Sequence, residues 1–352
     1  MPAYDAIRPL LFRLGPERAH QFTLRLLALA GVLPPIQPLL KRQFASAGEV
    51  TPVEMFGLRF PNPIGLAAGY DKDGSAMHGL ACLGFGHLEL GTVTPKPQIG
   101  NPRPRIFRLV EDQALINRMG FPNSGVDRLL ERLRRRPKDV VIGVNIGKGA
   151  ETRLEAAAED YLLLLRALHP NVDYLAVNVS SPNTIGLRQL QARQNLLALL
   201  RAIAEARAEL GSRQMPILVK LAPDLNDAEL EDAVQVIAET GMDGVIACNT
   251  TTQRPGLRSP LQGEQGGLSG GPLRARSLQV IRKVHDLSGG KLPVIGVGGI
   301  LGPREAREAL QAGAALIQIY TGLVYRGPGL VREILEGLEA DGRRLDLSLP
   351  RA

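Results

Sequence analysis

The chain has 352 residues, of which 44% are hydrophobic and 22% charged, and this indicates a globular protein with a substantial core rather than a disordered or collagen-like chain. A net charge of +7 permits attraction to an anionic partner, but only 4% of the residues are aromatic and no nucleic-acid-binding motif is present, so nucleic acid is not expected as a partner. Two cysteines cannot supply a disulfide framework or the usual ligands of a zinc site, so no metal is expected, and no run reaches the ~18 apolar residues that span a bilayer.

Residues 1–44 differ in pattern from the rest of the chain. Four apolar residues between positions 7 and 14 have the i, i+3, i+4, i+7 spacing of an amphipathic helix. Gly15 and Pro16 interrupt this pattern, and a second helix with basic residues between apolar ones is expected over residues 17–31. Two short helices here could cap a larger unit or lie in a membrane interface, and periodicity alone leaves both open.

From residue 62 onward, short apolar runs typical of buried strands alternate with helical patterns. Helices are expected, for example, over residues 151–168 and 226–240, and the second begins with the capping-box spacing of Asn226 and Glu229. Eight strand–helix units predict a closed barrel of parallel strands, and an open doubly wound sheet is the alternative. The predicted strands cover residues 63–68, 87–94, 140–146, 174–180, 216–222, 244–250, 293–299 and 315–321.

Polar or small residues recur at the carboxyl end of nearly every predicted strand. This distribution favours the barrel, because barrels bind ligands at that rim, whereas an open sheet concentrates its ligand near one switch point. The residues are Lys72, Thr92, Asn145, Asn178, Lys220, Asn249, Gly299 and Thr321.

Three glycine-rich segments come late in the chain, at residues 266–272, 296–300 and 319–322. Glycine lets the backbone approach a ligand closely, and free backbone N–H groups favour a phosphate. Two of the segments follow the last two predicted strands, where barrels often bind phosphate. Each alone could be a simple turn, but together they predict a ligand that carries a phosphate.

Two lysines lie at predicted strand ends. Lys72 could be a solvated surface residue or the partner of a carboxylate or phosphate. Lys220 lies among apolar residues in PILVKLA, and buried lysines are rare without a partner. We therefore expect Lys220 to contact an anionic or electron-rich group of a ligand.

Asparagines form a second recurring group at the predicted rim. An amide offers two donors and an acceptor, so several together suit a planar heterocycle with alternating N–H and C=O groups, although a single one would be a turn former. The segment NVSSPNT at residues 178–184 adds Ser181, and no His, Asp or Glu next to it suggests a hydrolase triad. The asparagines are Asn145, Asn178, Asn183 and Asn249.

Eight longer segments resemble dihydroorotate dehydrogenases of the membrane-associated, quinone-dependent class. They occur in the family's order, and the resemblance extends from residue 17 to residue 329, which makes it far more specific than any one short motif. The segments are NPIGLAAGYDKDG, GTVTPKPQIGNPRPRIFRL, LINRMGFPN, NVSSPNTIGLR, VKLAPDL, CNTT, GGLSGGPL and PVIGVGGI.

The resemblance implies an α/β fold, a (β/α)8 TIM barrel with a small N-terminal helical extension, that holds FMN. It also implies oxidation of dihydroorotate to orotate in pyrimidine biosynthesis, with the reduced flavin passing electrons to a quinone. The FMN contacts that it implies are Ala67, Ala68, Gly69, Tyr70, Asp71, Lys72, Thr92, Asn145, Asn178, Lys220, Cys248, Gly270, Gly299, Tyr320 and Thr321.

Ser181 matches the family's catalytic base, at a position where the soluble classes have Cys. Because a free serine is a poor base, its proton must leave through a relay, which the resemblance places at Thr184 and Phe121. Lys220 would lie near the N1–C2=O edge of the flavin and stabilise its reduced, anionic form. The implied substrate contacts are Lys72, Asn117, Arg118, Met119, Gly120, Phe121, Asn178, Asn183, Asn249 and Thr250.

The resemblance also gives the N-terminal segment a role. Residues 1–44 would form the membrane-associating mouth of a quinone tunnel, with His20 and Arg108 at the quinone site, and residues 45–352 the catalytic barrel. The expected protein is a peripheral membrane protein, a monomer or weak oligomer, on an anionic surface. The expected location is the cytoplasmic face of a bacterial inner membrane, or the mitochondrial inner membrane in a eukaryote.

Three positions depart from the family's pattern. Cys248 stands where Thr is usual and removes a hydroxyl from the flavin phosphate side. Tyr70 stands where Leu or Phe is common, and Pro122 where Asn is common after GF. None of the three changes the class that the resemblance implies.

Overall fold

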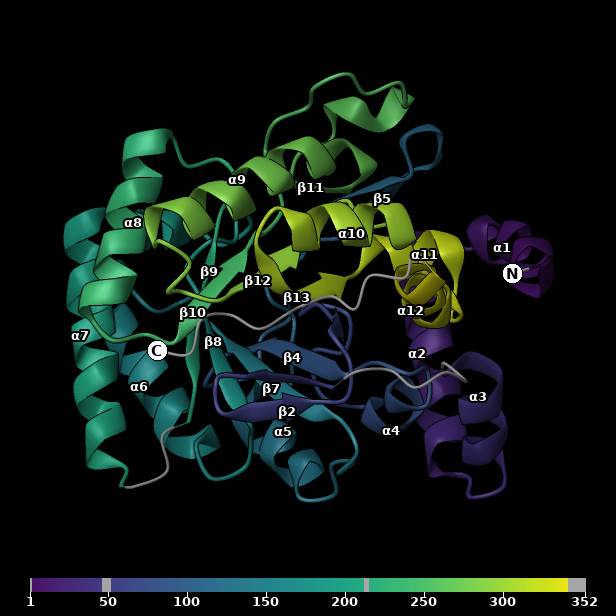
Figure 1. The fold of residues 1–352 in the computed structure, drawn as a ribbon, viewed down its shortest axis with the longest axis horizontal. Helices are drawn as coiled ribbons and strands as arrows, with labels where there is room; N and C mark the ends of the chain where they lie inside the picture. Colours follow the sequence, from purple (N-terminus) through teal and green to yellow (C-terminus); the bar gives the residue numbers. More distant parts are fainter. Residues whose placement is uncertain (1, 46–51, 212–214, 341–352) are drawn as a thin grey trace.

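The structure is a computed structural model that describes residues 2–45, 52–211 and 215–340. Its centre is a closed barrel of eight parallel strands, in the order β10-β12-β13-β3-β4-β7-β8-β9 around the ring (Figure 1). The (β/α)8 fold is confirmed, and each predicted strand overlaps an observed one. The barrel strands are β3 (Ile64–Leu66), β4 (His87–Val93), β7 (Val141–Ile146), β8 (Tyr174–Asn178), β9 (Ile217–Leu221), β10 (Gly244–Ala247), β12 (Val294–Val297) and β13 (Ala314–Ile319).

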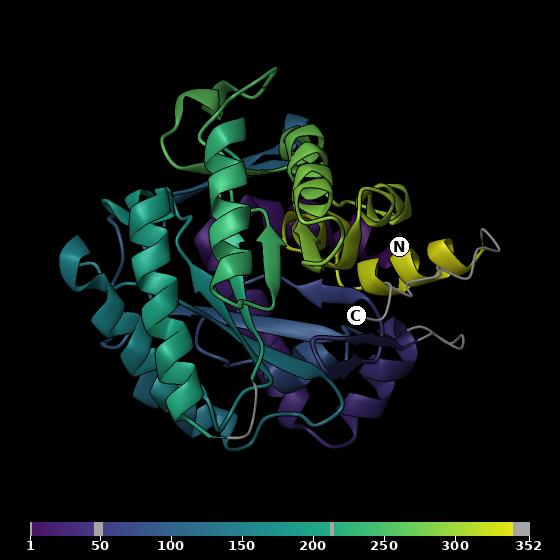
Figure 2. The ribbon, with the colours of Figure 1, turned by 60° about the vertical axis from the view of Figure 1, so that its left-hand side comes forward.

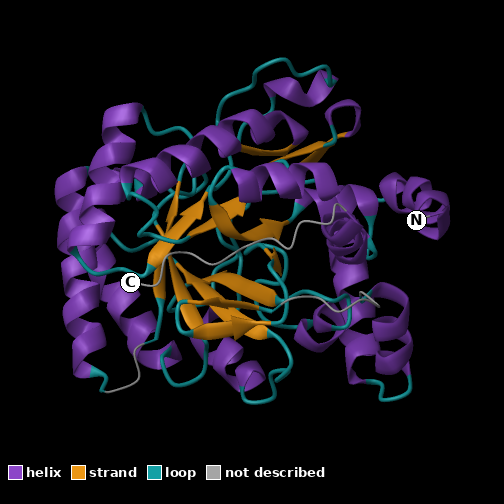
Figure 3. Cartoon of the chain, in the orientation of Figure 1, coloured by secondary structure: helices purple, strands orange, loops and turns teal. Residues whose placement is uncertain are grey.

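Helices form the outer layer around the barrel (Figures 2 and 3). The capping box predicted at α8 is present: Glu229 N donates to Asn226 Oδ1 at 3.0 Å, and Asn226 N donates to Glu229 Oε2 at 2.8 Å. The helices that follow the first barrel strand are α4 (Met77–Ala81), α5 (Gly125–Leu133), α6 (Ala157–Leu168), α7 (Arg193–Glu209), α8 (Asp227–Glu239), α9 (Arg274–Leu287), α10 (Pro303–Gln311), α11 (Thr321–Arg326) and α12 (Leu330–Ala340).

The helix predicted over residues 151–168 begins later than expected, with α6 at Ala157 after a 3-10 turn at Leu154–Ala156. The preceding loop is held by Lys148, whose Nζ donates to the carbonyl oxygens of Gly149 at 2.9 Å and Thr152 at 2.6 Å. Because these carbonyls bind the ammonium group, they do not start a helical ladder, and the helix begins after the loop.

Alternate residues of each barrel strand point to opposite sides, because the side-chain period of a strand is two. In β4, Leu88 and Leu90 belong to the core between the strands and the helices, whereas Glu89 points into the barrel and contacts Lys220 of β9. Val219, next to Lys220, packs on the helix side. The same alternation directs polar side chains of several strands into one interior layer.

Two smaller sheets close the ends of the barrel, and the sequence pattern does not predict them. The hairpin of β1 (Val53–Met55) and β2 (Leu58–Phe60) covers the amino end, where its apolar residues join the interior core. An antiparallel sheet of β5 (Ile106–Leu109), β6 (Ala114–Asn117) and β11 (Gly267–Gly270) lies across the loops at the other end. These short strands lie outside the eight strand–helix units of the predicted barrel, so the pattern that identified those units did not identify them.

Three helices, not two, precede the barrel: α1 (Pro2–Arg13), α2 (Pro16–Val32) and α3 (Ile36–Phe44), at the right of Figure 1. The third was missed because of its prolines, but Pro38 falls in its first turn, where proline is tolerated. Helix α2 packs closely on α4, since a Cβ on Gly79 would lie 2.0 Å from the carbonyl oxygen of Leu27.

Within the described residues, no single helix has the length and apolar character to cross a membrane, and the only pair that reaches them together, α2 and α3, is bent by 118°. The predicted division between residues 44 and 45 adjoins residues 46–51, which lie outside the described part of the chain. The division into two units therefore stays a prediction.

Candidate active site

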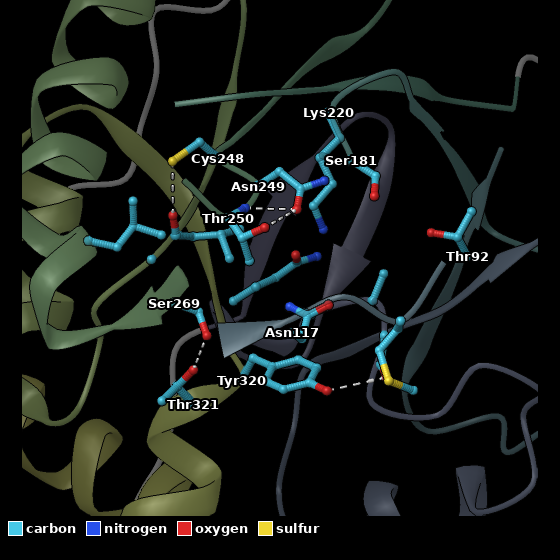
Figure 4. A pocket seen from close by; sticks show the side chains of 18 of the residues that line it. Thr92, Asn117, Ser181, Lys220, Cys248, Asn249, Thr250, Ser269, Tyr320 and Thr321 are labelled. Atoms are coloured by element: carbon cyan, nitrogen blue, oxygen red, sulfur yellow. Dashed lines mark hydrogen bonds between the residues drawn. The ribbon is translucent and has the colours of Figure 1, made fainter. Parts of the chain in front are cut away.

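One pocket at the carboxyl end of the barrel brings together most of the predicted site residues (Figure 4). It holds ≈ 1000 Å³ of space between atoms, open solvent included. The predicted residues that line it are Ala67, Ala68, Gly69, Lys72, Thr92, Asn117, Met119, Gly120, Phe121, Asn178, Ser181, Asn183, Lys220, Cys248, Asn249, Thr250, Gly270, Gly299, Tyr320 and Thr321.

Several predicted residues do not line this pocket. The carboxylate of Asp71 accepts hydrogen bonds from the backbone N–H groups of Ser75 at 2.8 Å and Ala76 at 2.7 Å, so it shapes the loop after β3. Arg118 is turned to Glu264, 2.7 Å away. The remaining ones are Asn145 and Thr184, which are buried beside the pocket, and Tyr70, His20 and Arg108, which line a second cavity.

Sequence reasoning also missed residues that belong to the site. Gln318 and Ser269 line the pocket, and Glu89 lies directly beneath it in contact with Lys220. Glu89, like Lys220, is a charged residue inside a predicted apolar strand. The sequence pattern that singled out Lys220 could therefore have identified Glu89 as well. Ser269 had no such signal, because the strand that positions it is too short to show a pattern.

The floor of the pocket is a chain of buried polar side chains. Lys220 Nζ and Asn145 Nδ2 donate to the Glu89 carboxylate at 3.1 and 2.9 Å. Asn145 Oδ1 in turn accepts from Asn178 Nδ2 at 2.9 Å and from Thr92 Oγ1 at 2.5 Å. These bonds fix the orientation of both amides, so the rim of the barrel presents a preorganised polar surface.

Amide groups also line the side of the pocket beneath β6. Asn183 Nδ2 donates to Asn117 Oδ1 at 3.2 Å, and both side chains are half-buried. Asn249 Nδ2 donates to Asn178 Oδ1 at 3.3 Å, while its own Oδ1 accepts from Thr250 N at 2.8 Å. Three of the four predicted asparagines, Asn178, Asn183 and Asn249, therefore line one pocket, and the fourth, Asn145, is buried beneath them and orients Asn178.

Ser181 lies in the pocket and is 5% exposed. Its Oγ accepts a hydrogen bond from Asn183 N at 3.2 Å, which fixes the side chain within the loop. Three residues along, Thr184 Oγ1 is buried and has no hydrogen-bond partner among the described residues. A buried hydroxyl without a protein partner is a site that water usually satisfies.

Lys72 is half-buried at the edge of the pocket, and its Nζ donates to the carbonyl oxygen of Gly69 at 2.6 Å. Burial lowers the pKa of Lys72 to about 8, because the charged form loses solvation; the positive Arg105 adds to this, and nearby carboxylates such as Asp73 oppose it. An ammonium group that is only partly satisfied by one carbonyl is suited to bind an anionic ligand group.

The opposite end of the pocket is lined by backbone rather than by charged side chains. Gly298 and Gly299 have φ of 127° and 73°, conformations that favour glycine, and Gly270 has φ of 96°. The Cys248 thiol is directed to the carbonyl oxygen of Val297 at 3.8 Å, and burial raises its pKa to about 12. The neutral thiol is thus directed to a backbone carbonyl within the protein.

A second, mainly apolar cavity of ≈ 1260 Å³, open solvent included, lies between the N-terminal helices and the barrel. Tyr320 lines both cavities. Its ring centroid is 5.7 Å from that of Tyr70, and the Tyr70 centroid is 4.9 Å from that of His20.

Burial lowers the pKa of His20 to about 3, and the charge of Lys72 adds to the effect, so the imidazole is neutral at pH 7. Arg108 lies over the ring of Phe12, 4.5 Å from its centroid. His20, Arg108 and Tyr70 are therefore together, in a cavity separated from the first by aromatic rings.

Comparisons with known proteins agree on one family. Residues 50–341 match the family model described as dihydroorotate dehydrogenase. The chain is 49% identical over 341 residues to a dihydroorotate dehydrogenase (quinone) of Azotobacter vinelandii, covering 96% of this chain and 97% of the relative. It is 51% identical over 334 residues to one of Chromobacterium violaceum, covering 94% and 96%. A crystal structure of DHODH from Eimeria tenella in complex with ferulenol is similar, with a TM-score of 0.86, 37% identity and coverage of 94% and 93%.

Proposed function

The chain belongs to the dihydroorotate dehydrogenase family, and from that premise we propose that it oxidises (S)-dihydroorotate to orotate in pyrimidine biosynthesis, with a quinone as the electron acceptor. The observation that carries the proposal is the pair of adjoining cavities. One is polar, with amides, a lysine and a serine; the other is apolar and opens between the N-terminal helices. An enzyme that must serve both a polar substrate and a lipid-soluble oxidant needs two such sites.

FMN is proposed as the cofactor of the polar pocket. Gly270, Gly298 and Gly299 line the pocket and would let a phosphate approach the backbone closely, and Lys220 lines the same pocket. Gln318 lines the pocket, and its Oε1 is buried with no partner among the described residues, so a ligand N–H group would satisfy it. When bound, FMN would supply a two-electron acceptor for a hydride. The predicted FMN contacts that line the pocket are proposed to hold it.

Lys72 and the amides are proposed to bind the substrate. The ammonium group of Lys72 would pair with the substrate carboxylate, and Asn117, Asn178, Asn183 and Asn249 would hydrogen-bond the ring N–H and C=O groups. Because neighbouring groups already orient these amides, little order has to be created when the substrate binds. Such positioning can supply several kcal/mol of the barrier reduction.

Ser181 is proposed as the base that takes the proton from C5 of the substrate, while C6 loses a hydride. As Oγ accepts that proton, the hydroxyl's own proton must leave, because serine is too weak a base to keep both. Thr184, three residues further along the loop, has a buried hydroxyl without a partner among the described residues, and Phe121 lines the pocket. We propose that water bound at Thr184 carries the proton away.

The second cavity is proposed as the quinone site, with Arg108 and His20 as its polar groups and Tyr70 in its wall. The exposed sides of α1, α2 and α3 carry large apolar residues, including Leu10 and Leu29, among basic ones. This surface suits peripheral attachment to an anionic bilayer at the cytoplasmic face of a bacterial inner membrane. A monomer or weak oligomer stays the prediction for the assembly state.

The decisive experiment is an anaerobic visible spectrum of the purified protein. We expect a bound flavin spectrum that bleaches on addition of dihydroorotate and returns on addition of a ubiquinone analogue. Fumarate and NAD are the matched oxidants, because soluble flavoproteins of the same superfamily use them. Reoxidation by either one, and not by the quinone, would contradict the proposed acceptor. A protein that stays colourless with added FMN would reject the flavin altogether.

Orotate binding is expected to depend on pH through Lys72. The pKa of Lys72 lies at about 8, so its charge is present below pH 8 and is lost as the pH rises. Affinity for orotate should be constant between pH 6 and 7 and fall above pH 8, approaching about tenfold per pH unit when only the protonated form binds. Orotate titrations followed by the flavin spectrum measure this. Lys72→Met should bind weakly with no such step, and an equally flat profile in the native protein would refute the assignment.

A further inference from the structure

Glu89 is buried at the centre of the barrel and holds side chains from four other strands. Its side chain is 0% exposed. Lys220 Nζ and Asn145 Nδ2 donate to Oε1 at 3.1 and 2.9 Å, and Gln318 Nε2 and Tyr174 OH donate to Oε2 at 2.8 and 3.3 Å. An ionised carboxylate only accepts hydrogen bonds, and all four partners donate. The set of contacts therefore matches a carboxylate anion.

Lys220 and Glu89 form a buried ion pair with unequal access to the pocket. The lysine side chain is 6% exposed and lines the pocket, whereas Glu89 does not line it. Of the lysine's three N–H donors, one is directed to Glu89. The rest of the ammonium group is available to a ligand, and the carboxylate lies behind it.

We propose that Glu89 is a positioning residue that sets the reduction potential of the bound flavin by offsetting the charge of Lys220; this rests on the proposed FMN site. A cation in a desolvated pocket favours extra negative charge on a neighbouring ligand, and an anion directly behind that cation weakens the effect. Glu89 thus keeps the flavin easier to reoxidise than Lys220 alone would leave it. The same carboxylate fixes the amide of Asn145, which orients Asn178.

Glu89→Gln separates the charge of Glu89 from its shape. The amide oxygen can still accept from Lys220 and Asn145, and the amide nitrogen can donate to Tyr174 OH, so three of the four hydrogen bonds can be kept. The fourth, from Gln318 Nε2, is lost unless Gln318 rotates and turns its Oε1 away from the ligand. We expect the midpoint potential of bound FMN to rise by at least the equivalent of a tenfold change in the ratio of reduced to oxidised flavin, about 30 mV for a two-electron couple. Potentials are measured against reference dyes with dithionite, which needs no dihydroorotate.

Three further variants keep the test decisive. Glu89→Asp retains the charge and should stay closer in potential to the native protein than Glu89→Gln does. Lys220→Met should lower the potential, and Lys220→Met with Glu89→Gln should lie above Lys220→Met, because only the charge of Glu89 differs between them. If Glu89→Gln alone does not hold FMN, the comparison of Lys220→Met with the double variant tests the inference instead.

The inference is overturned if the native protein and Glu89→Gln have equal potentials and Lys220→Met and the double variant also have equal potentials. A shift in thermal stability with no shift in potential would likewise show that Glu89 is only structural. If instead the native protein binds no FMN, or its flavin is not reduced by dihydroorotate, the proposed function fails first. The two failures are therefore distinguishable.

Discussion

Ser181→Ala is expected to keep FMN bound while lowering the rate of flavin reduction by dihydroorotate at neutral pH by about 10²- to 10⁴-fold, the usual contribution of a positioned general base. Only the proton acceptor is lost, because the Ser181 hydroxyl makes one hydrogen bond among the described residues, as the acceptor from Asn183 N. The side chain is 5% exposed, and alanine leaves its space for water rather than for a clash. Anaerobic stopped-flow absorbance at saturating dihydroorotate measures the rate.

Ser180→Ala is the matched control. Ser180 precedes the proposed base but is fully buried, and its hydroxyl donates to Asn178 Oδ1 at 3.1 Å and accepts from Asn249 Nδ2 at 2.9 Å. Its removal should weaken binding of the substrate more than it slows flavin reduction at saturation. Near-native flavin reduction in Ser181→Ala would refute the assignment of Ser181 as base.

Filling the second cavity is expected to abolish quinone reduction and spare flavin reduction. Ala19 lines that cavity from α2, together with His20. In Ala19→Trp the indole would occupy the space proposed for the quinone, while the polar pocket, which Ala19 does not line, should be unchanged. We expect reoxidation of the flavin by a ubiquinone analogue to slow at least tenfold, with reduction by dihydroorotate within about twofold of native.

Gln21→Trp tests whether a tryptophan on α2 is harmful in itself. Gln21 is exposed and does not line the cavity, so both half-reactions should stay near native. The coarser variant, removal of residues 1–44, should also impair quinone reduction more than flavin reduction. Equal loss of both half-reactions, in Ala19→Trp or in the truncation, would point to a folding role for the helices instead.

The barrel could be predicted because its strands are short apolar runs bounded by glycine, proline and polar residues. The strand over residues 217–221 is an example. It is buried on both faces, so its residues are apolar, and only Lys220 interrupts the run. Helix α3 and the sheet of β5, β6 and β11 could not be predicted in the same way. Prolines obscure the helical pattern of the first. The second combines a local hairpin of β5 and β6 with β11, which comes from a distant part of the chain, and lies outside the eight strand–helix units.

The polar rim was predictable as a set, but the role of each member was not. Asp71, Arg118 and Asn145 matched the family's contacts, yet the structure directs the first to a turn, the second to Glu264 and the third to Glu89. Their assignments as direct ligand contacts remain predictions that this geometry does not support. A side chain's direction depends on which neighbour it finds in three dimensions, and one sequence does not contain that information.

The order of apolar runs and turns along this chain is enough to predict eight strand–helix units with polar residues at the strand ends, and so to favour a closed barrel over an open sheet, because alternation along a strand is a local rule. The meeting of Glu89 with Lys220, and of the N-terminal helices with Tyr70 and Tyr320, was decided only by the tertiary structure. These contacts join residues far apart in the sequence, across the barrel interior in one case and between helices and barrel in the other. Their energies depend on distance and burial, which exist only once the chain is folded.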